Sequence, residues 1–132
     1  MREILFRGKR ADDGEWTCGN LTVWSDGSTS IDIAEASPLY AVIPETVGQY
    51  IGLTDKNGKK IFEGDIVKRE FTLWHGETKK TRETQIGVVV YSNRECCFQV
   101  EKKYYLRKPW DGDTIEVIGN IHDNPELLKG GE

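Results

Sequence analysis

The chain is poor in the residues that build disulfide frameworks and metal centres. Its 132 residues include three cysteines and two histidines. Cys18 stands alone and Cys96 is adjacent to Cys97, so the count is odd and no CxxC spacing occurs. This pattern excludes a disulfide scaffold and fits a reducing compartment. His75 and His122 lie far apart, with no second ligand at metal-binding spacing, so we expect no metal site.

Long apolar runs are also missing. No stretch approaches the roughly 20 apolar residues that a membrane span needs, and residues 1–10 hold no apolar run of signal-peptide length. We therefore expect a soluble, cytosolic protein with no membrane contact. In such a protein the adjacent cysteines Cys96 and Cys97 are predicted to be buried in a strand, because free cysteines usually behave as small apolar residues.

Charge is plentiful but unevenly distributed. Hydrophobic residues make up 37% of the chain and charged residues 30%, which predicts one packed domain rather than a disordered chain. Residues 11–67 hold ten acidic and three basic side chains. By contrast, residues 68–84 hold five basic and three acidic ones, and residues 94–110 hold five and two. Separate acidic and basic surfaces are therefore expected, although the net charge is -4.

The periodicity is mostly that of short strands. Asp26-Gly27 predicts a hairpin turn between strands at 22–24 and 31–33. Gly87 lies inside an apolar run, where it predicts a bulge or bend. Asn124-Pro125 followed by Glu126 predicts a short helix that ends at Gly130. Further strands are predicted at 65–73, 84–91, 96–101 and 115–118, with an exposed hairpin tip at 74–82 and a loop at 108–114.

The glycine-rich block at residues 48–67 predicts turns rather than a nucleotide site. It contains neither G-x-x-x-x-G-K-[ST] nor G-x-G-x-x-G, and no helix pattern follows it. Asn57-Gly58 is typical of a tight turn, because both residues tolerate a positive φ. No cofactor is expected here.

Catalytic patterns are equally scarce. The carboxylates, among them Asp55 and Glu63, stand singly at predicted turns, and no serine lies in a G-x-S-x-G elbow. We therefore predict that the protein is not an enzyme, with a hydrolase built from scattered carboxylates as a distant alternative.

Basic and aromatic residues alternate in the second half of the chain. Small barrels use such surfaces to stack bases and hold phosphates, so nucleic-acid binding is the alternative function. Tryptophans are also enriched at protein interfaces, so this surface could instead bind a partner protein or a second copy of the chain. The candidate binding residues from this region are Trp74, Lys102 and Tyr104.

Three segments resemble the YopX family of phage and prophage proteins. They are the opening MREILFR at 1–7, the block GQYIGLTDKNGKKIFEGDIV at 48–67, and the ending IGNIHDNPELL at 118–128. Ile51 and Phe62 stand where Thr and Tyr are common in the family. The resemblance implies an origin in a phage or prophage and a site of action in the cytoplasm of a bacterial host.

The resemblance also implies a fold and a set of motif residues. The expected fold is mainly β, with a small SH3-like barrel and a short C-terminal helical turn at 48–132 and additional N-terminal strands at 1–47. The polar and aromatic motif members Gln49, Tyr50 and Asp55 are candidates for binding. The motif positions expected to be structural are Gly52, Gly58, Gly64, Asp65, Gly119, Asn120, Asn124 and Pro125. The resemblance supplies no catalytic residues to transfer, so the first hypothesis is a non-enzymatic structural module or one that binds a host or phage protein.

Overall fold

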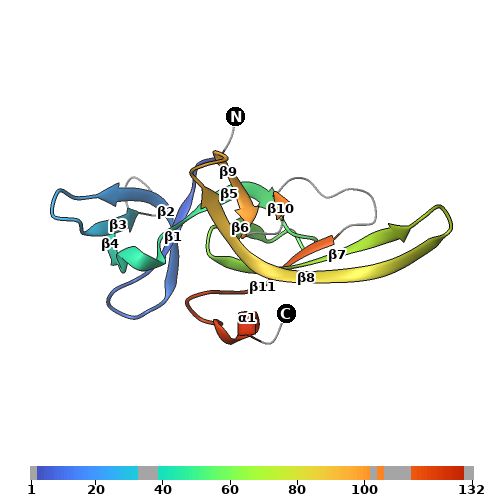
Figure 1. Ribbon diagram of the computed structural model, residues 1–132. Coiled ribbons are helices and arrows are strands. Elements are labelled where there is room, and N and C mark those ends of the chain that lie inside the picture. Colours follow the sequence, from blue (N-terminus) through green and yellow to red (C-terminus); the bar gives the residue numbers. More distant parts are fainter. Residues whose placement is uncertain (1–2, 33–38, 102–103, 106–113, 130–132) are drawn as a thin grey trace. The chain divides into compact units, whose positions relative to one another are not determined.

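The computed structural model describes residues 3–32, 39–101, 104–105 and 114–129 (Figure 1). The chain divides into two compact units, residues 1–52 and 53–132. The described residues are mainly β, as predicted, and the strands pair antiparallel. Most of the predicted loop at 108–114 lies outside the described residues.

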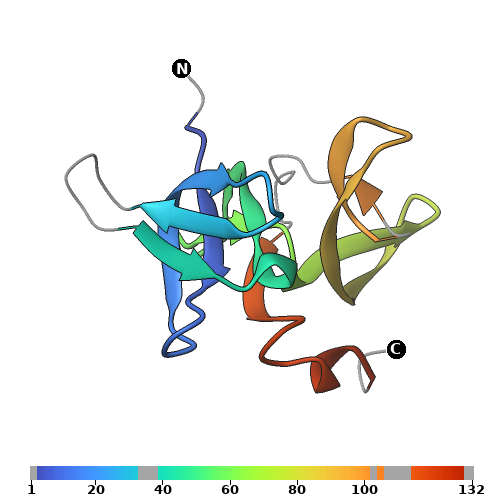
Figure 2. The same ribbon diagram turned by 90° about the vertical axis from the view of Figure 1, so that its left-hand side faces the viewer.

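The first unit is a meander of short antiparallel strands, with one 3-10 turn before its last strand. In spatial order the strands of this unit run β4-β3-β2-β1-β5, and Figure 2 shows β2, β3 and β4 side by side. The elements in chain order are β1 (Phe6–Lys9), β2 (Trp16–Val23), β3 (Thr29–Asp32), β4 (Leu39–Val42), the 3-10 turn (Pro44–Thr46) and β5 (Gly48–Thr54).

The predicted hairpin at Asp26-Gly27 is confirmed. It joins β2 to β3, with Val23 opposite Thr29, and Gly27 has a φ of 90°. Asp26 accepts hydrogen bonds from the backbone N–H and the hydroxyl of Ser28, which holds the turn. Ile31 and Val42 are buried and supply apolar core to this unit.

Strand β4 has its outer edge covered by the chain at the end of β1. Ala11 N–H donates to the Ala41 carbonyl at 2.8 Å, and Ile43 N–H donates to the Lys9 carbonyl at 2.8 Å. Arg10 forms an isolated antiparallel bridge with Val42. Because these bonds occupy the backbone groups of β4, this short strand is protected from edge-to-edge pairing.

The second unit contains a long hairpin and the C-terminal helix. Its sheet has the order β10-β9-β8-β7-β11. The fully buried side chains Ile61, Ile66, Val67, Val89 and Val100 form its core, and each contributes about 1.5–3 kcal/mol when removed from water. The elements are β6 (Lys60–Phe62), β7 (Asp65–His75), β8 (Lys79–Ser92), β9 (Cys97–Val100), β10 (Tyr104–Tyr105), β11 (Thr114–Asn120) and α1 (Glu126–Lys129).

Helix α1 confirms the predicted C-terminal helical turn. An SH3-like closed barrel, however, is not formed by the pairing of the described strands. Closure requires a continuous ladder between the last and first strands of a sheet. A single bridge joins β4 to the end of β1, and the outer edge of β11 is met by a turn, whose Lys56 N–H donates to the Ile115 carbonyl at 2.9 Å.

Two local features differ from the predictions. Gly87 forms no bulge, because the ladder between β7 and β8 passes through it without a shift, and the register shift lies in β11 between Val117 and Gly119. The adjacent cysteines are not buried as predicted: Cys96 is exposed and Cys97 is half-buried. Cys96 has a φ of 57° in the turn before β9, so the strand begins only after it.

Candidate functional site

The turn after β5 is organised by the Asp55 carboxylate. Its Oδ1 accepts hydrogen bonds from the backbone N–H groups of Asn57 and Lys59, both at 2.9 Å. Its Oδ2 accepts the Val117 N–H of β11, 62 residues away in the chain, at 2.9 Å. Asp55 is only 7% exposed, and Gly58 turns the backbone with a φ of 81°. The carboxylate therefore ties this turn to the edge of β11.

These contacts favour the charged form of Asp55. Burial raises the pKa of its carboxyl group, but the hydrogen bonds from the Val117, Lys59 and Asn57 N–H groups outweigh burial. The positive charge of Lys59 acts in the same direction, so the pKa lies below its usual value. Because both carboxylate oxygens of Asp55 accept hydrogen bonds from backbone N–H groups, this side chain has a structural role.

Gly64 and Asp65 open β7 in a similar way. Asp65 is 1% exposed, and its Oδ2 accepts the Phe62 N–H at 2.8 Å. Gly64 has a φ of 93°, its N–H donates to the Val89 carbonyl, and its own carbonyl accepts the Ile121 N–H. This glycine turn therefore joins the start of β7 to both β8 and the segment after β11.

The C-terminal motif forms a compact polar turn. The Asn120 side-chain carbonyl accepts the N–H groups of His122 and Asp123, and the Asn124 N–H donates to the Asn120 backbone carbonyl. A Cβ at Gly119 would lie 2.7 Å from Asn124 Oδ1 and 2.9 Å from Leu127 Cδ1. A larger residue at position 119 would therefore have to displace the side chains of Asn124 and Leu127, and Pro125 stands immediately before α1.

The remaining candidate residues lie on different structural elements. Gln49 is half-buried on β5 opposite Phe6, and Tyr50 is 8% exposed. Gly52 has a φ of 92° with open space around it. Lys102 lies outside the described residues, and Tyr104 is placed only as backbone, in β10 opposite Val100. Gln49 and Tyr50 therefore belong to the first unit, whereas Asp55 and Trp74 belong to the second, in the turn after β5 and in β7.

Trp74 belongs to a projecting two-stranded ribbon, which we call the arm. The arm comprises residues 71–75 of β7, the turn 76–78 and residues 79–83 of β8, and it projects to the right in Figure 1. Strand β11 pairs with β7 only as far as Glu70, and β9 pairs with β8 only over 89–92. Among the described strands, the two halves of the arm therefore pair only with each other.

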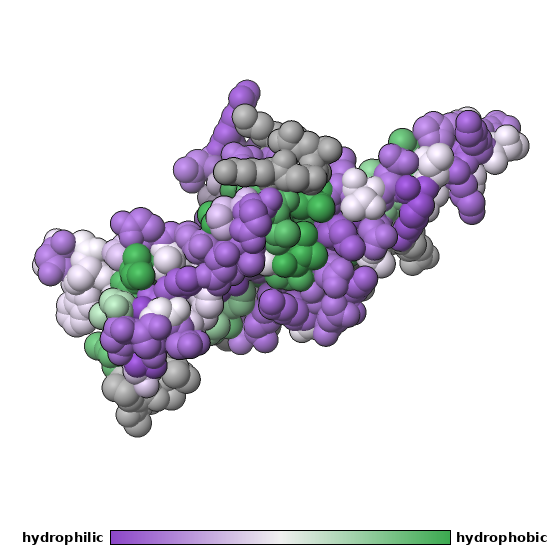
Figure 3. Space-filling model, turned by 90° about the horizontal axis from the view of Figure 1, so that it is seen from below, coloured by the Kyte–Doolittle hydropathy of each residue, from purple (hydrophilic) through white to green (hydrophobic). Residues whose placement is uncertain are grey.

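Register assigns the arm residues to two faces, because directly paired residues point to the same side. One side, which we call the cationic face, consists of the pairs Trp74–Lys80 and Thr72–Arg82. The opposite side, the mixed face, consists of Phe71, Leu73, His75, Lys79, Thr81 and Glu83. Figure 3 shows the arm as a mainly hydrophilic projection at the right.

The cationic face is exposed and ordered by contacts within the arm. Trp74 is 57% exposed, and the Lys80 Nζ lies 5.3 Å from the centre of its ring. The Arg82 Nη1 donates to the Thr72 hydroxyl at 3.2 Å. No described carboxylate forms an ion pair with Lys80 or Arg82, whereas Lys68, nearer the sheet, pairs with Glu116 at 3.8 Å. The arm therefore offers an aromatic ring beside two cations.

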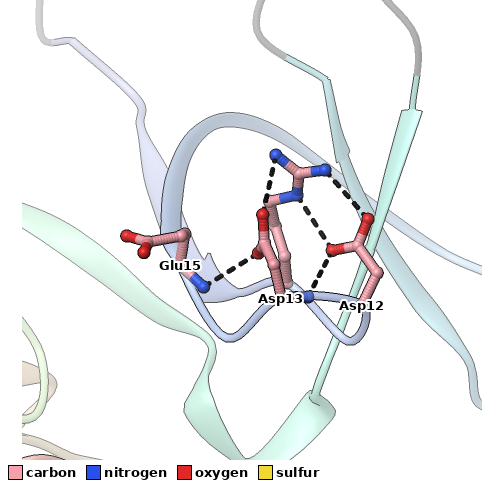
Figure 4. A network of polar contacts seen from close by, with 4 residues as sticks. Asp12, Asp13 and Glu15 are labelled. Carbon is pink, nitrogen blue, oxygen red and sulfur yellow. Dashed lines mark hydrogen bonds and ion pairs between the residues drawn. The ribbon is translucent and has the colours of Figure 1, made fainter.

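A second polar group lies in the first unit, in the loop between β1 and β2. Figure 4 shows Asp12 and Asp13 beside the Arg10 guanidinium, which contacts Asp12 at 2.9 Å and Asp13 at 3.4 Å, whereas the Glu15 carboxylate points away. The hydrogen bond from Arg10 lowers the pKa of Asp12. These bonds close the loop internally, since Asp13 also accepts the Glu15 N–H.

Other chemistry is not assembled in the described part of the chain. No group of three or more His, Cys, Asp or Glu side chains there could hold a metal ion. His75 lies on the arm, with its Nε2 3.0 Å from the Thr81 hydroxyl. None of the helices among these residues has the length and apolar character needed to cross a membrane.

The exposed hairpin tip predicted at 74–82 is confirmed, but its two strands run closer to the turn than expected, as far as His75 and from Lys79 onward. The turn consists only of Gly76, which has a φ of 81°, and the two residues after it, Glu77 and Thr78. Alternation on both sides of Gly76, with Thr72 and Trp74 before it and Lys80 and Arg82 after it, was the available signal. A three-residue glycine-containing turn between alternating segments is typical of a hairpin.

Comparison with known proteins identifies the lineage. The crystal structure of protein EF1440 from Enterococcus faecalis is similar in fold, with a TM-score of 0.56 and 24% sequence identity. The similarity covers 97% of this chain and 99% of that chain. The search of curated proteins found no match. The family model described as YopX protein matches residues 5–129, so the chain belongs to the YopX family.

Proposed function

We propose that the protein is a non-enzymatic binding module that contacts a partner protein through the arm. The observation that carries this proposal is the exposed Trp74 beside Lys80 and Arg82 on an otherwise unpartnered ribbon. Tryptophan and arginine are enriched among the residues that dominate interface energies. An exposed aromatic side chain on a well-paired β ribbon also loses little conformational freedom on binding, which favours affinity.

The proposed setting is a bacterial cell that carries a phage or prophage. The resemblance of the three sequence segments to phage and prophage proteins supports it. In this setting the module is an accessory protein that acts on a host or phage protein in the cytoplasm. The absence of a catalytic role is part of the proposal: the buried carboxylate of Asp55 is fully engaged by backbone donors, and that of Asp65 accepts the Phe62 N–H.

Nucleic-acid binding is the competing function, because a two-stranded ribbon fits the major groove of DNA. A ribbon inserted in a groove meets phosphates on both sides, and here Glu83 on the mixed face and Glu77 at the turn would repel them. Lys80 also covers one side of the Trp74 ring, which base stacking would have to displace. These contacts favour a one-sided protein contact.

The test is affinity capture from a lysate of the bacterium that carries the gene, followed by quantitative mass spectrometry. The bait proteins are the wild type, Trp74→Ala and a matched control, Trp24→Ala. Trp24 is 47% exposed but lies in the first unit, where its indole N–H donates to Ser30. We expect a protein captured by the wild type and by the control to be lost from Trp74→Ala.

Two results would count against protein binding by the arm. In the first, Trp74→Ala captures the same proteins as the wild type. In the second, nuclease treatment removes the captured material, and binding of purified DNA or RNA falls steeply with added salt. The second result would favour the nucleic-acid function.

A further inference from the structure

The two faces of the arm differ in charge. The cationic face carries Lys80 and Arg82 and no carboxylate, whereas the mixed face pairs Phe71 with Glu83. The nearest carboxylate on the side of the cationic face is Glu70, which belongs to the next pair toward the sheet. A partner that approaches the cationic face therefore meets two positive charges and an indole ring.

The two cations are held in position by neighbours that leave their charges uncompensated. The Lys80 ammonium rests over the Trp74 ring, and the Arg82 guanidinium uses one N–H for the Thr72 hydroxyl. Arginine has five N–H donors in a planar fork, so the others remain for a carboxylate. Contacts that order these long side chains before binding reduce the entropy lost on binding.

We propose that the cationic face is specific for a carboxylate-rich segment of the partner protein, with an apolar residue of that segment against Trp74. This inference rests on the proposed function and names the chemistry of its partner. The reason is complementary charge. The Arg82 guanidinium can bind a carboxylate through two parallel hydrogen bonds, and Lys80, two residues away on the same face of β8, supplies a second positive charge.

The first experiment selects ligands without assuming the partner. A displayed library of random linear peptides is selected on the wild-type protein and depleted on Trp74→Ala. An enrichment in Asp and Glu with one apolar residue supports the inference. Arm-dependent peptides without acidic residues overturn it and leave protein binding by the arm intact. Selection of no arm-dependent peptide overturns both the inference and the proposed function.

The second experiment uses two adjacent lysines on opposite faces. Lys80→Glu reverses a charge on the cationic face, and Lys79→Glu makes the same change on the mixed face. The probe is the best selected peptide, labelled and followed by fluorescence anisotropy. We expect Lys80→Glu to weaken binding about tenfold, Lys79→Glu to change it less than about twofold, and added salt to weaken binding to the wild type. Equal effects of the two reversals would overturn the assignment to one face.

Discussion

Replacing Asp55 by alanine tests whether one carboxylate holds the second unit together. The substitution removes the acceptor for three backbone N–H groups, those of Asn57, Lys59 and Val117. The N–H groups of Asn57 and Lys59 belong to an exposed turn and can form hydrogen bonds with water instead. Val117 lies on β11 and is half-buried, so its N–H is harder to rehydrate.

The cost follows from these three bonds. A hydrogen bond to a charged acceptor contributes about 1.5–3 kcal/mol, which applies to Val117. The two turn donors regain water, so each contributes about 0.5–1 kcal/mol. We therefore expect Asp55→Ala to lower the free energy of unfolding by roughly 2.5–5 kcal/mol, a large part of the 5–15 kcal/mol typical of a domain.

The assay is urea denaturation followed by circular dichroism, with amide exchange of Val117 as the local readout. Asp55→Asn is the matched control, because it keeps one acceptor oxygen but places an NH2 group against a donor; an intermediate loss is expected. Asp26→Ala removes an exposed turn carboxylate and should cost less than Asp55→Ala. A loss below about 1 kcal/mol for Asp55→Ala, with unchanged exchange at Val117, would refute the reasoning.

The same carboxylate predicts a pH dependence. The folded-state pKa of Asp55 lies below the ordinary value of 3.8, so ionised Asp55 stabilises the fold above that value. This stabilisation is lost as the pH falls through the folded-state pKa. We expect the wild type to lose more stability than Asp55→Asn when the pH is lowered across this range. Parallel acid titrations of stability in the two proteins would contradict the assignment.

Three further substitutions test other parts of the structure. Gly119→Ala should cost about 1–3 kcal/mol, because its Cβ would meet Asn124; an unchanged melting temperature would contradict this. Gly19→Ala should prevent correct pairing of β2 with β3, because the Cβ would lie 2.0 Å from the Asp32 carbonyl oxygen; a native circular dichroism spectrum would disprove it. Trp74→Ala should change stability by less than about 1 kcal/mol, since the ring is exposed; a larger loss in urea denaturation would make it structural.

The turns of this protein were predictable because their chemistry is local. Asp26-Gly27 and Asn57-Gly58 specify tight turns from neighbouring residues alone, and both are found where the sequence placed them. The C-terminal helix followed from the Asn124-Pro125 start in the same way. The prediction that Cys96 and Cys97 are buried was wrong because the burial of a residue at the end of a short strand depends on which side chains pack over it.

The partners of Asp55 could not be read from the chain. Its turn partners are two and four residues away, but Val117 is 62 residues away, and only the folded chain brings that N–H to the carboxylate. A glycine-rich block that suggested binding thus contains a structural acceptor. The proposed binding surface lies instead on the arm, where the register between β7 and β8 determines which side chains share a face.

Residue order alone determined the mainly β class, the turn positions and the family, because alternation, glycine turns and short motifs are properties of neighbouring residues. Tertiary structure decided that the strands pair as two sheets without a continuous closing ladder among the described residues. It also decided that Trp74 shares a face with Lys80 and Arg82 rather than with Lys79. The physical reason is register: a shift of one residue in a strand moves every side chain to the opposite face, and long-range pairing sets that shift.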